Sequence, residues 1–201
     1  MKYMPRIVIA AVLLAAGPAM AEVPGTQGLG GPAVEGVCLL GREAVFANAE
    51  IGKSATAQIA RLTEQAQAEV DAERTPLESE AKGFEAQRGQ LTAEDYEKKQ
   101  RALAGRWEVL QQKAAHRGRE IEATRVKALE RISNEAQPVI AAVYKSRNCG
   151  LLLDRGVALG GNLSGDLTES VVLELDRKIK TISIQREVLP YAPMATGASG
   201  R

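Results

Sequence analysis

The sequence is poor in the residue types that carry out catalysis and bind metals. It has one histidine, His116, and two cysteines, Cys38 and Cys149, among 201 residues. His116 has no partner motif for nucleophilic catalysis, and its charged neighbours in a helical stretch predict that it is exposed to solvent. One histidine and two cysteines also lack the spacing of a zinc site. We therefore expect neither an enzyme nor a protein with a metal or another cofactor.

Motifs for nucleotide or ester chemistry are also missing. The sequence has no Walker loop, and its Gly-Leu-Gly-Gly stretch at 28–31 lacks the flanking strand and helix of a nucleotide-binding loop. In the glycine-bounded stretch 161–165 the serine falls one place too late for a nucleophile elbow. The chain has 26 basic and 25 acidic residues. Such a neutral balance gives no reason to expect nucleic acid as a partner.

Long hydrophobic runs are absent except near the start of the chain. Residues 7–16 are apolar, follow Lys2 and Arg6, and precede the small residues of Ala19-Met20-Ala21. This is the pattern of a secretory signal peptide, and the run is too short to span a bilayer. We predict residues 1–21 as a signal peptide cleaved after Ala21, with an uncleaved anchor as the alternative. The glycine- and proline-rich residues 22–35 are predicted to be a flexible leader.

Export to an oxidising compartment also gives the two cysteines a possible role. Cys38 and Cys149 both follow the predicted cleavage site, and each lies beside a predicted strand. They are therefore a possible disulfide, with two separate buried thiols as the alternative.

Most of the remaining chain has the pattern of two long helices. Apolar residues recur at intervals of three and four from Ile51 to Leu91, and again from Tyr96 to Val143. Thr92 followed by Glu94 and Asp95 is typical of a helix start, so we expect the second helix to begin there. Because the break between the helices is short, they must form an antiparallel hairpin, predicted over residues 51–132.

The seam of this hairpin is predicted to be weak. Small alanines and the charged residues Glu73 and Arg88 occupy positions where large apolar groups would be needed. Pro76 removes a backbone donor and predicts a bend in the first helix, either within it or at the start of a new helix. We expect a loose arm in which Pro76 is either a hinge or a static kink.

Short strands are predicted on both sides of the hairpin. Residues 37–40 and 151–154 are apolar, and residues 156–159 are a possible third strand. A short helix is predicted to follow Asp166-Leu167-Thr168, with Asp166 as its cap and Glu169 reaching back to it. The fold class is therefore α+β: residues 36–50 and 133–180 form a small body that carries the hairpin, and residues 181–201 are predicted to be a disordered extension. So little sheet favours association of several chains through the strands.

This order of elements resembles the Skp (OmpH-like) periplasmic chaperones over residues 36–180. The stretch Gln137-Pro138-Val139-Ile140 resembles the family's turn into the body. The most specific match is the pattern D-L-T-x-x-V-x-x-x-L-D, whose matching residues are Asp166, Leu167, Thr168, Val171, Val172, Leu175 and Asp176. The glycine-rich leader, the two cysteines and the C-terminal extension depart from better-known members.

The resemblance implies a jellyfish-like homotrimer in which three hairpins, or tentacles, surround a cavity. Such a protein holds unfolded outer-membrane β-barrel proteins in the periplasm without ATP and prevents their aggregation. Scattered apolar residues on a loose arm suit weak, reversible binding of such clients. The alternative for these residues is that they pack the two helices together, and the alternative function is that of a structural coiled-coil protein of the cell envelope. The candidate client-binding residues are Phe84, Leu91, Tyr96, Leu103 and Trp107.

Charge is distributed unevenly between the two helices. Residues 50–85 contain eight acids and four bases, whereas residues 98–131 contain ten bases and four acids. The positive excess on the second helix would suit anionic clients or an anionic membrane surface, although a solvated helix face is the commoner explanation.

Overall fold

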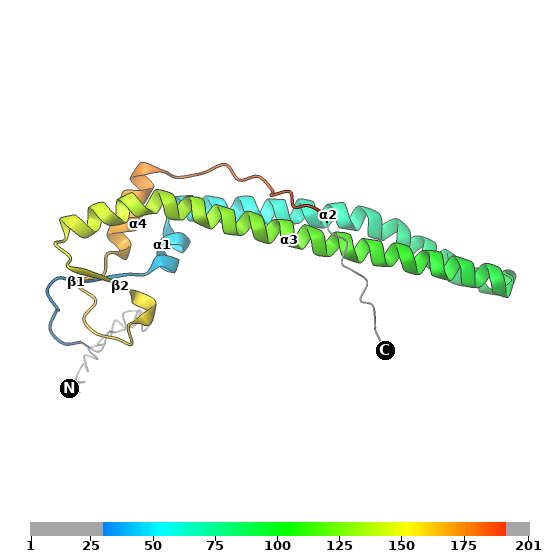
Figure 1. Cartoon of the computed structure of the whole chain (residues 1–201), viewed down its shortest axis with the longest axis horizontal. Helices are drawn as coiled ribbons and strands as arrows, with labels where there is room; N and C mark the ends of the chain where they lie inside the picture. Colours follow the sequence, from blue (N-terminus) through cyan, green and yellow to red (C-terminus); the bar gives the residue numbers. More distant parts are fainter. Residues whose placement is uncertain (1–29, 192–201) are drawn as a thin grey trace, which may run out of the picture.

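The protein is a long helical hairpin with a small body at one end (Figure 1). The computed structural model describes residues 30–191. The predicted signal peptide, residues 22–29 of the predicted leader and residues 192–201 of the predicted extension lie outside this range. The elements in chain order are β1 (Val37–Leu40), α1 (Arg42–Asn48), α2 (Glu50–Ala86), η1 (Arg88–Gln90), α3 (Ala93–Ser146), β2 (Leu151–Asp154), η2 (Arg155–Val157) and α4 (Thr168–Lys178).

Helices α2 and α3 form the arm of the molecule and run side by side (Figure 1). The 37 residues of α2 span about 55 Å at the rise of an α-helix. The side chain of Thr92 accepts a hydrogen bond from Asp95 N at 3.2 Å, which confirms the predicted start of the second helix. The predicted apolar faces meet along the arm, where the buried residues are Ile51, Ala55, Ala66, Val70, Leu77, Phe84, Leu103, Leu110, Ile121, Ala128, Ile132, Ala136, Val139 and Val143.

Helix α2 continues through Pro76 without a break. The expected alternative in which a new helix starts at Pro76 is therefore wrong. Val70 and Leu77 are each 3% exposed on the two sides of the proline. Their burial against α3 offsets the backbone hydrogen bond that Pro76 cannot make.

The body contains a two-stranded parallel sheet. Strand β1 pairs with β2 from Val37 opposite Leu151 to Leu40 opposite Asp154. The other edge of β1 is covered by the chain before α4, because Leu39 N donates to Gly165 O at 3.0 Å and Leu167 N donates to Leu39 O at 2.9 Å. Within the described residues, β2 has no strand partner on its outer edge.

The possible third strand at 156–159 does not form. Asp154 instead accepts a hydrogen bond from Gly156 N at 2.8 Å and so starts the 3-10 turn η2. This local side-chain bond turns the chain away from the sheet, in the manner expected of aspartate.

The start of α4 also differs in detail from the prediction. Asp166 does accept a hydrogen bond, from Thr168 N at 2.8 Å, but Glu169 is exposed and does not reach back. The hydroxyl of Thr168 accepts instead from Gly41 N at 2.8 Å, and Arg155 donates to Asp166 at 2.9 Å. The predicted cap at Asp166 is therefore wrong, because Leu167 is the N-cap residue and makes no side-chain cap bond. Asp166 and Thr168 instead tie the start of α4 to Arg155 and to the end of β1.

One hydrophobic core joins the body to the root of the arm. It packs residues of β1, α1 and α4, such as Leu40, Val45 and Leu175, against Ile51 of α2 and Ile132 of α3. Cys38 and Cys149 form a disulfide that links β1 to the turn between α3 and β2. The chain leaves α3 through Asn148, whose φ of 52° is the left-handed conformation common at helix ends.

Residues 181–201 were predicted to be disordered. The structure contradicts this prediction for residues 181–191, the part that it describes. Residues 179–191, here called the strap, extend from α4 along the arm (Figure 1). The strap has no helix or strand of its own, but Ile182 is 7% exposed and belongs to the core. Its side chains and backbone are bound by both helices, so its order comes from packing that the local composition does not reveal.

The junction of α1 and α2 requires a glycine, which yields a stability prediction. A Cβ atom at Gly52 would lie 1.8 Å from the carbonyl oxygen of Phe46, whereas one at Gly105 in α3 would meet open space. We expect Gly52→Ala to lower the free energy of unfolding by about 1–3 kcal/mol because the backbone must shift. Gly105→Ala is the matched control and should raise it by up to about 1 kcal/mol. Urea unfolding followed by circular dichroism measures both, and equal effects would contradict the prediction.

Candidate functional site

The five predicted client-binding residues gather in one cluster in the outer half of the arm. Phe84 and Leu103 are buried there, at 8% and 9% exposure, and Leu91, Tyr96 and Trp107 are half-buried against them. The rings of Phe84 and Tyr96 stack with their centroids 4.7 Å apart. In the single chain these residues therefore join α2 to α3, and the exposed parts of Leu91, Tyr96 and Trp107 are what they present to a partner.

An apolar groove lies at the root of the arm, where the sequence predicted no site. This root groove has a volume of about 610 Å³ and runs between α1, α2 and α3. Phe46, Ile59 and Leu129 line it together with several alanines, and Glu43 and Arg125 are its charged residues. Leu129 is 44% exposed. The signal in the sequence was the run of small residues on α2 opposite Leu129, a residue outside the predicted apolar face.

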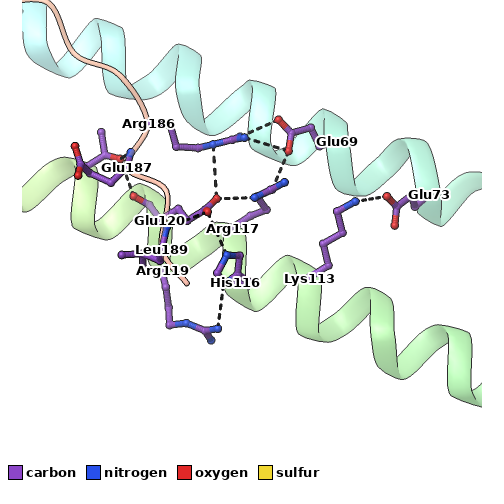
Figure 2. Close-up of polar contacts among 11 residues, drawn as sticks. Glu69, Glu73, Lys113, His116, Arg117, Arg119, Glu120, Arg186, Glu187 and Leu189 are labelled. Carbon is purple, nitrogen blue, oxygen red and sulfur yellow. Dashed lines mark hydrogen bonds and ion pairs between the residues drawn. The ribbon is translucent and has the colours of Figure 1, made fainter. Parts of the chain in front are cut away.

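Midway along the arm, a cluster of charged side chains lies among α2, α3 and the strap (Figure 2). Arg186 of the strap donates to both carboxylate oxygens of Glu69, at 2.9 and 3.4 Å. Arg117 of α3 donates to Glu120 at 2.7 Å, and its Nε lies 2.8 Å from Glu69 as an ion pair without hydrogen-bond alignment. We call Glu69, His116, Arg117, Glu120 and Arg186 the ionic cluster.

The expectation that His116 is exposed is wrong. His116 is 5% exposed, and its Nε2 lies 3.1 Å from Glu120 Oε1. On the other side of the ring, Nδ1 lies 3.4 Å from the guanidinium of Arg119. The ring also packs edge-on against Tyr191 of the strap, with centroids 5.1 Å apart. His116 therefore supports the strap, and Arg117 and Glu120 lie inward with it, whereas Arg119 is exposed.

The two glutamates of the ionic cluster are stabilised in their charged form. Burial by itself would raise the pKa of Glu120, whose side chain is 1% exposed, but hydrogen bonds from Arg117 and from Leu189 N hold it below its ordinary value. The hydrogen bond from Arg186 and the charges of Arg186 and Arg117 lower the pKa of Glu69 against a smaller opposing effect of burial.

Other charges of the arm pair across the two helices near the surface. Arg106 pairs with Glu80, and Lys113 pairs with Glu73. These pairs neutralise part of the predicted positive excess of α3. Exposed pairs of this kind contribute little stability individually.

Two other kinds of site do not occur within residues 30–191. No group of histidine, cysteine, aspartate and glutamate side chains in this range is arranged to hold a metal ion. No helix in the same range combines the length and apolarity needed to cross a membrane.

Comparison with known proteins identifies the family of this arm and body. The model of the family described as outer membrane protein (OmpH-like) matches residues 37–175. The chain belongs to the OmpH-like family. A crystal structure from Caulobacter crescentus CB15, described as a candidate outer membrane chaperone (OmpH-like), is 35% identical to this OmpH-like protein, with a TM-score of 0.72. The likeness covers 82% of this chain and 97% of the Caulobacter chain. No curated protein matches the sequence.

The ionic cluster yields a prediction for a buried and an exposed glutamate of α3. We expect Glu120→Gln to lower the free energy of unfolding by about 3 kcal/mol, because Arg117 and Arg186 lose a buried partner. Glu122, whose side chain is 67% exposed beside Arg125, is the matched control, and Glu122→Gln should change the free energy by less than about 0.5 kcal/mol.

The same two variants test how the free energy of unfolding depends on pH. Since folding lowers the pKa of Glu120 and Glu69, their stabilisation is complete above the ordinary glutamate pKa of about 4.3 and is lost as pH falls through the lowered values. Urea unfolding between pH 7 and 3 should therefore show a smaller acid loss for Glu120→Gln than for Glu122→Gln. Parallel acid losses would contradict this account.

Proposed function

We propose that this OmpH-like protein is a periplasmic chaperone that binds unfolded outer-membrane proteins and prevents their aggregation. Family membership over residues 37–175 carries the proposal. The open root groove supports it, because an apolar surface beside a long arm suits weak binding of an unfolded chain. Release by weak contacts requires no ATP. The signal-peptide pattern supports export to the periplasm.

The client would contact two regions of the arm. The root groove offers Phe46, Ile59 and Leu129. The outer cluster offers the half-buried Leu91, Tyr96 and Trp107, with Phe84 and Leu103 contributing if the helices separate. Unpaired positive charge on α3 would attract anionic clients or anionic lipid headgroups at long range. Whether Pro76 acts as a hinge or as a static kink is left open, as in the sequence analysis.

We also propose that the protein is a homotrimer joined through its body. Strand β2 has an open outer edge in the described chain, and Leu151 and Leu153 on it are 50% and 39% exposed. An isolated two-stranded sheet is marginally stable, and an open apolar edge favours pairing with another chain. The number three rests on the family resemblance, which also supplies the arrangement of three arms around a cavity.

Binding at the root groove is tested with two apolar residues of α3. Dilution of a urea-unfolded β-barrel protein into the chaperone should give little light scattering. Leu129→Gln should weaken this protection about fivefold, because roughly 1 kcal/mol of apolar contact is lost. Val126, which is 57% exposed but outside the groove, is the matched control, and Val126→Gln should protect as the native protein does. No protection by the native protein would favour a structural coiled-coil role instead.

The oligomer is tested by the light-scattering mass of the mature protein. We expect about three times the monomer mass for the native chain and a smaller mass for Leu151→Asp combined with Leu153→Asp, since charge would then be buried between subunits. Val188→Asp, at a residue 84% exposed on the strap, is the control and should leave the mass unchanged. A native protein that is monomeric would exclude the trimer.

A further inference from the structure

The strap occupies a surface formed by both helices of the arm. Thr181 bonds to Ser54 of α2 at 2.7 Å, Arg186 binds Glu69 of α2, and Lys127 of α3 pairs with Glu187 at 2.8 Å. These partners lie on α2 and α3 alike, so the extended chain runs along the arm in contact with both helices (Figure 1). We call this surface the strap groove.

The strap groove also binds the backbone of its occupant. Gln58 uses one amide for two contacts, since its Nε2 donates to Ile182 O at 2.7 Å and its Oε1 accepts from Ile184 N at 3.1 Å. Arg131 donates to the carbonyl oxygen of Ser183 at 2.6 Å. These bonds satisfy three consecutive residues of an extended chain without using their side chains.

The same form of recognition continues toward the middle of the arm. Thr124 donates its hydroxyl proton to Glu120 O at 2.6 Å, which leaves the hydroxyl oxygen free to accept from Glu187 N at 2.9 Å (Figure 2 shows Glu187 and Leu189 beside the cluster). Glu120 Oε1 accepts from Leu189 N at 3.4 Å. Thr124 and Glu120 are both 1% exposed, so they are fixed acceptors placed along the groove.

From Thr181 to Arg186 the side chains of the strap meet the groove with a period of two, which ends at the half-buried Glu187. Ile182 is buried, and Ile184 and Arg186 are half-buried, whereas Thr181, Ser183 and Gln185 face solvent. The strands of outer-membrane β-barrels alternate apolar and polar residues with this same period. A groove that binds backbone groups and accepts an apolar side chain at every second position would therefore fit many such segments.

We propose that the strap groove is a binding site for extended polypeptide with alternating apolar side chains, and that the strap is its resident competitor. The inference rests on the proposed chaperone function and names a second client-contacting surface for it, apart from the root groove. An intramolecular occupant reduces the apparent affinity for an external chain to the intrinsic affinity multiplied by the fraction of time for which the site is free. The strap would thus keep the groove closed until a client displaces it.

A binding experiment on the full chain tests the proposal. The probe is a fluorescein-labelled peptide with the sequence of residues 180–191, measured by fluorescence anisotropy. We expect weak binding to the native protein and at least about tenfold tighter binding to a chain whose own strap is weakened by Ile182→Asp, Ile184→Asp and Arg186→Ser. A second peptide of the same length with alternating valine and serine should also bind the weakened chain.

Two controls separate backbone recognition from nonspecific adhesion. The peptide N-methylated at the residues equivalent to Ile184, Glu187 and Leu189 cannot donate to Gln58, Thr124 and Glu120, and it should lose the gain in affinity. Adding Gln58→Met and Thr124→Val to the weakened chain should remove the gain too, whereas adding Gln67→Met, at an exposed glutamine of α2, should not. Equal binding of the N-methylated and unmodified peptides would overturn the proposal, as would no binding to a weakened chain of native helix content.

A second measurement needs no weakening of the strap. A photoreactive amino acid at Lys127, which is exposed beside Glu187, should cross-link to the strap in the free protein and to an unfolded β-barrel client when one is added. The same photoreactive amino acid placed at Leu129 reports on the root groove. Client adducts that form at Leu129 but never at Lys127 would overturn the proposal of a client site in the strap groove, while leaving the chaperone function intact. Peptide binding without any suppression of client aggregation would have the opposite meaning, because the groove would stand and the proposed function would fail.

Discussion

The arm depends on the charged layer that joins its two apolar parts. The core at the root reaches along the arm to Ala55 and Ile132, and the outer cluster begins at Val70 and Leu110. Between them the helices offer mainly alanines and polar groups to each other, and hydrophobic packing alone would leave that section weak. In this section Glu69 of α2 pairs with Arg117 of α3 and so joins the two helices. Arg117 also pairs with Glu120, and Arg186 of the strap pairs with Glu69, so the ion pairs include the strap.

This arrangement has consequences that purely apolar packing would not have. Apolar contact weakens gradually when helices slide, whereas the half-buried ion pair of Glu69 with Arg117 loses its attraction once the two charges separate. The ionic cluster therefore holds the arm in one register and makes the strap part of that register. Because Arg186 bridges to Glu69 and approaches Glu120 at 3.6 Å, departure of the strap removes charge neutralisation from both helices together. Occupancy of the strap groove and cohesion of the arm are thus coupled.

The sequence predicted the parts of the fold that rest on local patterns. The hairpin, its turn at Thr92, the strands of residues 37–40 and 151–154, and the short helix after Asp166 follow from apolar periodicity and capping residues. Two predictions were wrong for a common reason: that His116 is exposed, and that residues 181–191 are disordered. Each is fixed by a partner far away in the sequence, as His116 is by the ring of Tyr191, and local charge or composition does not reveal such partners. The possible strand at 156–159 failed because Asp154 bonds within its own turn.

The root groove was missed for a different physical reason. Its walls come from three helices, and the close approach that shapes it depends on Gly52, which brings the backbone of α2 against the carbonyl group of Phe46. A glycine inside a helix reads as a weak point when the sequence is taken alone. Here the missing side chain lets α1 fold back on α2, and it sets Phe46 and Leu129 on the same groove. Surfaces of this kind become visible only when the helices are placed. The two grooves also differ in chemistry. Apolar side chains line the root groove, whereas polar side chains of the strap groove form hydrogen bonds with the backbone of the bound chain. One arm therefore offers an unfolded chain both forms of contact.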